Sequence, residues 1–165
     1  SNIRIENNTM IGASTSSSTS SNLAAFYYTA TTPYPSGTWV LKGNTISNVS
    51  SGFYMYGSSS GSMDTLRIEN NTLDFWYYGI YSYYAKNPKI LNNTITKLGG
   101  TSNTYGYNYV YYPTGNAEFK GNTINDCRYG CYMYASAGSQ TWDVQDNTLN
   151  NAGYYGFYIT NSSRY

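Results

Sequence analysis

One pattern of apolar and polar residues, seen clearly in the stretch Leu66–Leu73, occurs six times along the chain. Apolar and polar residues alternate, a small or polar residue follows, and the copy ends in Asn-Thr and one apolar residue. Alternation with period two predicts a short strand that buries one face. The six copies are Ile3–Met10, Trp39–Ile46, Leu66–Leu73, Pro88–Ile95, Ala117–Ile124 and Trp142–Leu149.

A second pattern follows each copy. It consists of a small residue, usually Gly, and then a short aromatic segment that predicts another strand. The residue after Gly is expected to point inward, as at Phe53 and Tyr107, and the next residue outward, as at Tyr54 and Asn108. The segments are Ala25–Tyr28, Gly52–Tyr56, Gly79–Tyr83, Gly106–Tyr109, Gly130–Tyr134 and Gly156–Ile159.

The spacing of the copies indicates a solenoid. Successive copies are 22 to 36 residues apart when they are aligned on their Asn, and no segment has helical periodicity. The pattern resembles the right-handed parallel β-helix repeat of the pectate-lyase-like superfamily, over nearly the whole chain. We therefore predict an all-β fold, a right-handed parallel β-helix of about six coils in one domain, residues 1–165. A leucine-rich repeat is the alternative, because residues 63–73 also fit its spacing of Leu and Asn.

The aligned Asn has an architectural explanation. Equivalent residues of stacked strands lie about 4.8 Å apart, so their amides can form a ladder along one corner. The residue before it is Asn, Gly or Asp in every copy, and these types tolerate a left-handed backbone. The predicted ladder residues are Asn8, Asn44, Asn71, Asn93, Asn122 and Asn147.

Composition narrows the class of protein. Of the 165 residues only 10% are charged and the net charge is +1, so we expect no binding to nucleic acid. No apolar run is long enough to cross a bilayer, so we expect no membrane insertion. Nothing indicates a cofactor or a metal site. The chain starts and stops within the repeat pattern, and we expect it to be a segment of a longer or assembling protein.

Cys127 and Cys131 fall at positions that are apolar in other copies. They are either two buried free thiols or a local disulfide across a turn.

Charged side chains alternate along the predicted first strands. Stacking would place opposite charges side by side in Glu6–Lys42–Glu69 and in Lys89–Glu118, which stabilises a sheet and fixes its register. The sharper alternative is a catalytic group. The superfamily resemblance implies carboxylates with a cation in one cleft, and the residues that could form it are Arg67, Lys89, Glu118 and Asp143.

Tyrosine is unusually frequent, with 22 residues. Alternation in the second strands predicts two adjacent columns of exposed rings on one face. They could stack to stabilise the solenoid, or form a flat binding surface for sugar rings or for another protein. The predicted aromatic face comprises Tyr27, Tyr54, Tyr56, Tyr81, Tyr83, Tyr132, Tyr134 and Tyr158.

Low charge and a surface rich in Tyr, Ser, Thr and Asn favour an extracellular or cell-surface location. Asn48 and Asn161 are candidate glycosylation sites. The function that we expect is a non-catalytic structural or adhesive module of a filament, sheath or surface array. Its partners would be further copies stacked head to tail or neighbouring surface proteins. The alternative is a protein that binds or degrades polysaccharide.

Overall fold

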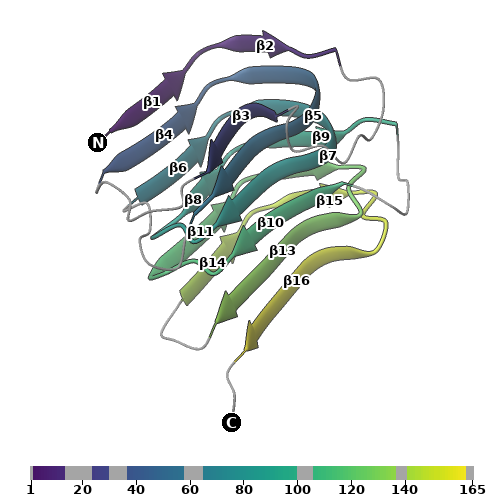
Figure 1. Cartoon of the computed structure of the whole chain (residues 1–165). Coiled ribbons are helices and arrows are strands. Elements are labelled where there is room, and N and C mark those ends of the chain that lie inside the picture. The colour runs from purple at the N-terminus through teal and green to yellow at the C-terminus, as the bar shows by residue number, and fades with distance from the viewer. Residues whose placement is uncertain are drawn as a thin grey trace.

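The computed structural model describes residues 2–13, 24–29, 37–57, 65–99, 106–136 and 141–162, without the side chains of residues 136, 161 and 162. These parts form strands and no helix, and every pair of strands is parallel. The chain winds as a solenoid from β1 at the top of Figure 1 to β16 at the bottom. The leucine-rich repeat alternative is wrong, and the predicted parallel β-helix is confirmed.

The first sheet contains the first strand of each repeat copy, in the order of the sequence. Its strands are β1 (Ile3–Glu6), β4 (Thr38–Lys42), β6 (Thr65–Glu69), β8 (Lys89–Leu91), β11 (Asn116–Lys120) and β14 (Thr141–Gln145).

The second sheet has ten strands and contains the rest of each turn. Its strands are β2 (Thr9–Ile11), β3 (Ala24–Thr29), β5 (Thr45–Tyr56), β7 (Thr72–Tyr83), β9 (Thr94–Lys97), β10 (Tyr107–Tyr111), β12 (Thr123–Asn125), β13 (Tyr129–Ser136), β15 (Thr148–Asn150) and β16 (Tyr155–Ser162).

The solenoid makes about four turns, slightly fewer than the six coils predicted. At the two edges of the first sheet, β1 and β14 each pair with a single neighbour. The turns that start with β4, β6, β8 and β11 are covered on both sides.

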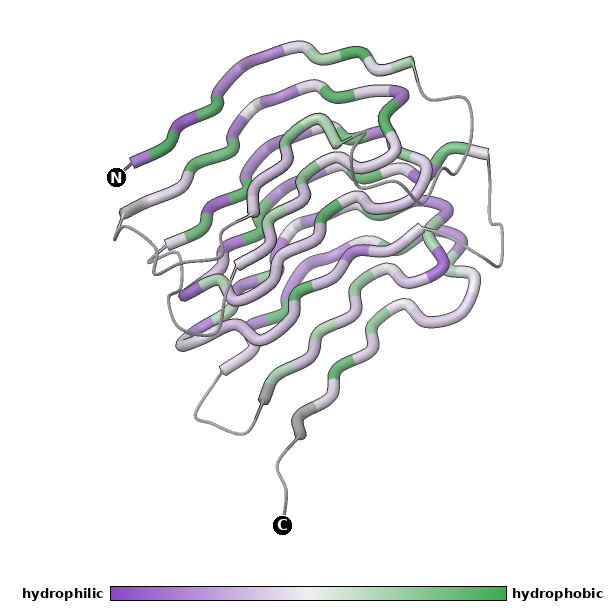
Figure 2. Tube along the Cα trace, viewed as in Figure 1, coloured by the Kyte–Doolittle hydropathy of each residue, from purple (hydrophilic) through white to green (hydrophobic). Residues whose placement is uncertain are grey.

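The hydrophobic pattern sets the register of the sheets. Ile5, Leu41, Ile68, Ile90, Phe119 and Val144 pair in succession across the first sheet. The four inner members of this column are buried, and the two at the edges are half-buried. A slip of one residue would move a whole strand's apolar set to solvent. Figure 2 shows the resulting alternation of hydrophobic and hydrophilic residues along the strands.

A ladder of asparagines runs along the corner between the first and second strands of each turn. The backbone N–H and the Nδ2 of each Asn donate to Oδ1 of the Asn in the next turn, at 2.9 to 3.1 Å. Nδ2 also donates to a carbonyl of the preceding turn, as from Asn71 to Leu41. The residue before each ladder Asn has a positive φ, between 54° and 65°. This corner is therefore made by the side chains predicted for it.

Both thiols are free, so the local disulfide considered for Cys127 and Cys131 is absent. Cys131 lies on the inward side of β13, where it is fully buried. Cys127 is in the turn before β13, and its Sγ contacts the carbonyl of Asn125 at 3.4 Å. Burial raises the pKa of the Cys127 thiol to about 12, which keeps it protonated at neutral pH.

Candidate functional site

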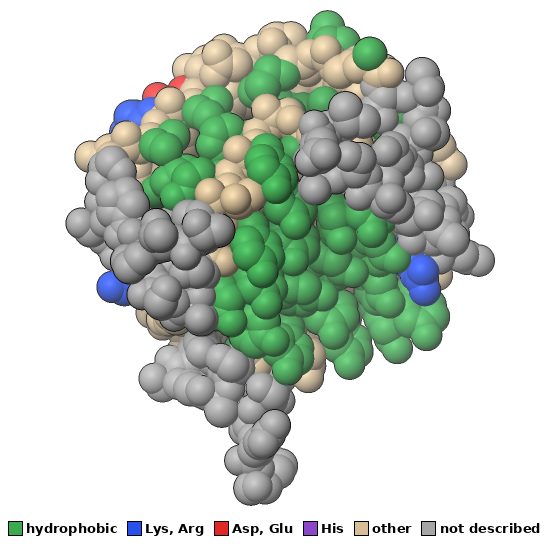
Figure 3. Space-filling model, viewed as in Figure 1, with side chains coloured by type: hydrophobic (Ala, Val, Ile, Leu, Met, Phe, Trp, Pro, Cys, Tyr) green, Lys and Arg blue, Asp and Glu red, His purple; other side chains and the backbone are tan. Residues whose placement is uncertain are grey.

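Tyrosines cover the outer face of one part of the second sheet, formed by β3, β10, β13, β16 and the C-terminal ends of β5 and β7, and we call this surface the tyrosine face. The second half of each turn contributes to it, because alternation turns every other side chain of these strands outward. The central column follows the register of the strands and consists of Tyr27, Tyr54, Tyr81, Tyr109, Tyr132 and Tyr158. Figure 3 shows the face as a continuous hydrophobic surface.

Two further columns flank the central one. One was predicted in part and consists of Tyr56, Tyr83, Tyr111 and Tyr134. The other was not anticipated and consists of Tyr78, Tyr107, Tyr129 and Tyr155. The tyrosine face is therefore wider than the sequence pattern indicated.

The rings pack against one another along and across the columns. Tyr54 and Tyr81 stack with centroids 4.6 Å apart, and Tyr56 and Tyr83 stack at 4.7 Å. Around β10 the geometry changes to edge-to-face, as between Tyr109 and Tyr132 at 5.5 Å. Both arrangements are favourable for aromatic pairs. The columns are thus held as a preformed surface.

The prediction for the β10 strand was wrong by one position. The pairing shifts between Tyr107 and Tyr109, which is a bulge. As a result Tyr107 lies on the outer face, and Asn108, expected outside, is fully buried. Its Oδ1 accepts a hydrogen bond from the N–H of Ile80 and its Nδ2 donates to the carbonyl of Gly130, both at 3.0 Å. An amide can occupy this inner position because both of its polar atoms are satisfied there.

A shallow groove of about 270 Å³ lies at one side of the tyrosine face, lined by Tyr83, Tyr111, Tyr112, Tyr132 and Tyr134. Tyr112 and its neighbour in the preceding turn, Tyr84, have positive φ values of 48° and 56°. Such values are unusual for bulky residues. The rings of these two residues stack at 5.1 Å, so the strained corner adds one more pair of rings beside the groove.

Burial raises the pKa of several hydroxyl groups of the face, which therefore stay protonated at pH 7. Burial raises the pKa of Tyr83 to about 12, with contributions from Tyr84 and Tyr112. Burial also raises the pKa of Tyr81, Tyr109 and Tyr111 further. A partner therefore meets rings and protonated hydroxyls, which donate and accept hydrogen bonds.

The first sheet carries the charges. Glu6, Lys42 and Glu69 are neighbours in register, as expected. Three of the ion pairs are nevertheless within a strand, Arg4 with Glu6 at 2.7 Å, Arg67 with Glu69 at 2.6 Å and Lys120 with Glu118 at 3.3 Å. Residues two apart on a strand share a face, and a long Arg or Lys side chain spans that distance.

The four residues of the catalytic alternative do lie side by side on this sheet. Each of them, however, has an ion-pair partner. Lys89 contacts Glu118 at 2.5 Å, and Lys120 bridges Glu118 and Asp143 at 3.3 and 2.5 Å. The hydrogen bond from Lys89 lowers the pKa of Glu118, which keeps this carboxylate ionised and unsuited to donating a proton. Within the described ranges no group of three or more potential metal ligands occurs.

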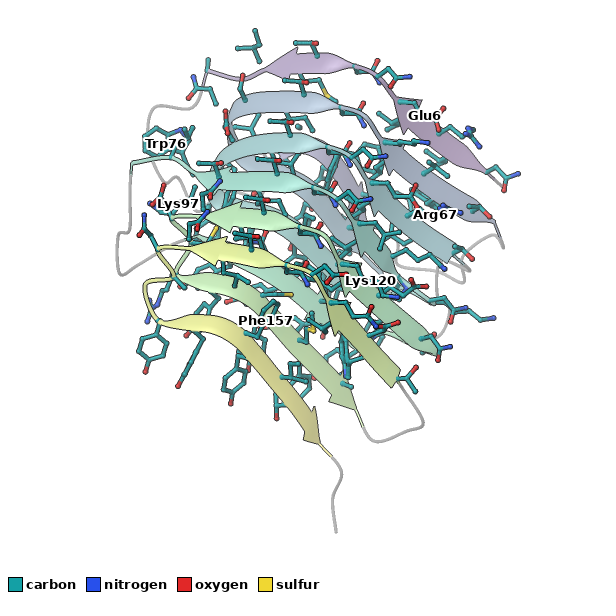
Figure 4. The ribbon with its side chains drawn as sticks, turned by 180° about the vertical axis from the view of Figure 1, so that it is seen from behind. Glu6, Arg67, Trp76, Lys97, Lys120 and Phe157 are labelled. Carbon is teal, nitrogen blue, oxygen red and sulfur yellow. The ribbon has the colours of Figure 1, made fainter. Side chains whose placement is uncertain are left out.

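Trp76 and Lys97 lie near one corner of the solenoid (Figure 4) and were not singled out from the sequence. Trp76 donates from Nε1 to Oδ1 of Asn48 at 3.2 Å, and Asn48 donates from Nδ2 to the carbonyl of Gly12 at 3.1 Å. Both polar atoms of the Asn48 amide, a candidate glycosylation site, are therefore hydrogen-bonded within the corner. The side chain of the other candidate, Asn161, lies outside the described residues. Lys97 is buried, which lowers its pKa, and its Nζ donates to the carbonyl of Leu98 at 2.9 Å.

The comparisons with known proteins agree with the geometry. The family described as "right handed beta helix region" matches residues 1–165. The comparison with curated proteins gave no match, and neither did the comparison with solved structures. In the parts of the chain that the structure describes, we find no helix with the length and apolar character needed to cross a membrane. The chain belongs to the right-handed β-helix family.

Proposed function

We propose that this chain is a non-catalytic structural or adhesive module that acts outside the cell or on its surface and contacts its partner through the tyrosine face. The observation that carries the proposal is the set of three adjacent tyrosine columns on one side of the second sheet.

Such a face suits adhesion for physical reasons. Tyrosine offers a large apolar ring with a hydroxyl that forms hydrogen bonds, and it is enriched at protein interfaces. Because the rings already pack against each other, ordering them on binding loses little further entropy. The ion-pair network of Lys89, Glu118 and Lys120 lies on the other sheet, so the contact surface itself is formed mainly by uncharged rings.

The groove beside the face favours a second candidate, binding of a polysaccharide. Its five tyrosines provide flat rings together with hydroxyl groups, a combination that fits the apolar face and the hydroxyls of a sugar ring. Because Glu118 and Asp143 are ion-paired, binding is favoured over degradation.

Retention on insoluble neutral and acidic polysaccharides and on intact cell surfaces tests both candidates. The variant Tyr54→Ala/Tyr81→Ala/Tyr132→Ala removes three rings of the central column, and we expect its bound fraction to fall at least tenfold. The corresponding Phe variant keeps the rings and separates their contribution from that of the hydroxyls. Circular dichroism checks that each variant remains folded.

The matched control is Lys42→Ala/Arg67→Ala/Lys120→Ala, which truncates three outward side chains of the first sheet and should leave retention unchanged. Equal retention of the Ala variant and the original chain would contradict a role for the tyrosine face. Release of new reducing ends or unsaturated sugars would contradict the non-catalytic assignment.

A further inference from the structure

The asparagine ladder has a direction. Every rung donates from its backbone N–H and its Nδ2 to the Oδ1 of the following turn, from Asn8 to Asn44 and onward to Asn147. At the last rung, Nδ2 of Asn147 donates to the carbonyls of Phe119 and Gln145. Within the described part of the chain, nothing accepts from the N–H of Asn147 and nothing donates to Oδ1 of Asn8. The two ends of the ladder are therefore complementary, one a donor and the other an acceptor.

The apolar interior is open at the same two edges. Phe157 and Ile159 of β16 are 37% and 49% exposed, although their register partners in β13, Cys131 and Met133, are completely buried. Figure 4 shows Phe157 on the last strand of the solenoid. At the opposite edge Ile5 of β1 and Met10 of β2 are only half-buried, although their register partners Leu41 and Ile46 are completely buried. Apolar residues of this kind are buried by another strand when a sheet continues.

The charges at the two edges are opposite. Arg4 of β1 and Asp143 of β14 occupy the same column of the first sheet. Within the solenoid the adjacent members of this column, Lys89 and Glu118, form an ion pair across strands at 2.5 Å. Placing a second copy on the edge would set its Arg4 beside Asp143 in the same geometry.

We propose that copies of this chain associate head to tail, with β14, β15 and β16 of one copy pairing in parallel with β1, β2 and β3 of the next. In the register of the repeat, Asn147 donates to Asn8 and Asp143 pairs with Arg4. The tyrosine column also continues, from Tyr158 to Tyr27. This association supplies the filament geometry of the structural role proposed above and rests on that role, but it uses the edges of the sheets instead of the tyrosine face.

Sedimentation velocity over a wide concentration range, together with electron microscopy, tests the association. The chain should form linear oligomers that lengthen with concentration. Arg4→Asp places two negative charges at the joint, and Asp143→Arg places two positive charges there. Each variant alone should associate at least tenfold more weakly.

The two variants complement each other. Mixed in equal amounts they should form an alternating polymer, and the double variant Arg4→Asp/Asp143→Arg should assemble like the original chain. Arg67→Asp makes the same charge change in the same column but away from the edges, so its association should be unchanged. Circular dichroism establishes that each variant is folded.

A chain that stays monomeric at all concentrations would overturn the proposal, and so would a mixture that fails to restore assembly. Surface retention of the monomeric single variants separates this result from the proposed function. Retained monomers would support the tyrosine face without stacking, whereas polymers that bind no surface would support stacking alone.

Discussion

A single asparagine satisfies an unusual number of backbone and side-chain groups at each turn of this solenoid. Oδ1 of Asn71 accepts from the N–H and the Nδ2 of Asn44. Its own Nδ2 donates to the carbonyl of Leu41 and to Oδ1 of Asn93. The residue is buried, so water cannot replace these bonds.

Replacing Asn71 by Ala should therefore destabilise the fold by about 3 kcal/mol, because buried donors and an acceptor lose their partners. Denaturant unfolding monitored by circular dichroism measures the loss. The neighbouring Asn70 is exposed with a φ of 55°, and glycine holds the equivalent position in two copies. Asn70→Gly should change the stability by less than about 0.5 kcal/mol. Equal effects of the two substitutions would argue against the ladder as the stabilising element.

The asparagine positions could be predicted from the sequence because they recur at a fixed place within an alternating pattern. The same reasoning gave the register of the first sheet and most of the central tyrosine column. The sequence pattern could not predict the ion pairs of Arg4 and Arg67. Each Arg could pair with a carboxylate on its own strand or on the next strand, and which one it contacts depends on the conformation and length of the side chain. Tyr78 and Tyr129 were missed because each comes directly before the Gly on which the second strands were aligned.

At the scale of the element, β10 has one residue fewer than its neighbours β7 and β13, because Asn108 alone separates Tyr107 from Tyr109 where two residues separate the paired tyrosines of each neighbour. Alignment on Gly106 placed Tyr107 inside and Asn108 outside, the reverse of what the structure shows. The bulge is decided by tertiary contacts: Asn108 fits beside Gly79, where a Cβ would collide with its Oδ1. The bulge returns Tyr109 to the central column and so preserves the tyrosine face.

Asn108→Ala should destabilise the fold by about 2 kcal/mol, because the N–H of Ile80 and the carbonyl of Gly130 would lose their partner in the interior. Unfolding in denaturant tests this, and the near-ultraviolet circular dichroism of the tyrosines reports whether the face rearranges. Asn150→Ala removes an exposed amide that donates to Asn125 and should have an effect below about 1 kcal/mol. A loss at Asn108 no larger than this control would show that the bulge is maintained by other contacts.

At the scale of the whole molecule, charged and aromatic side chains lie on different sheets. The first sheet carries ion pairs, and the second carries closely packed tyrosines whose pKa values are raised by burial. A hydroxyl group with a raised pKa stays protonated in the folded state at a pH where the unfolded chain has begun to ionise. The tyrosine face therefore makes the free energy of unfolding decrease as the pH rises into the alkaline range.

The free energy of unfolding should begin to fall above about pH 8.5, where the two buried thiols start to ionise in the unfolded chain, and should fall more steeply from about pH 10, the ordinary pKa of tyrosine, toward pH 12. The sign follows because the native state binds more protons than the unfolded state in this range. Denaturant midpoints measured from pH 8 to pH 12 test the prediction, with absorbance at 295 nm reporting ionisation of tyrosine. Complete ionisation near pH 10 in a chain that stays folded would contradict it.

The turn from Asn71 to Asn93 takes only 22 residues, and the structure describes all of it. Each turn makes its contacts with the turns directly before and after it. A duplicated turn would thus reproduce the same ladder bond, the same buried column and the same outward rings, and it would lengthen the solenoid by about 4.8 Å. The repeat fixes the cross-section of this molecule, whereas its height is a whole number of equal steps. Genetic duplication of one short unit would therefore change the height and leave the two dimensions of the cross-section unaltered.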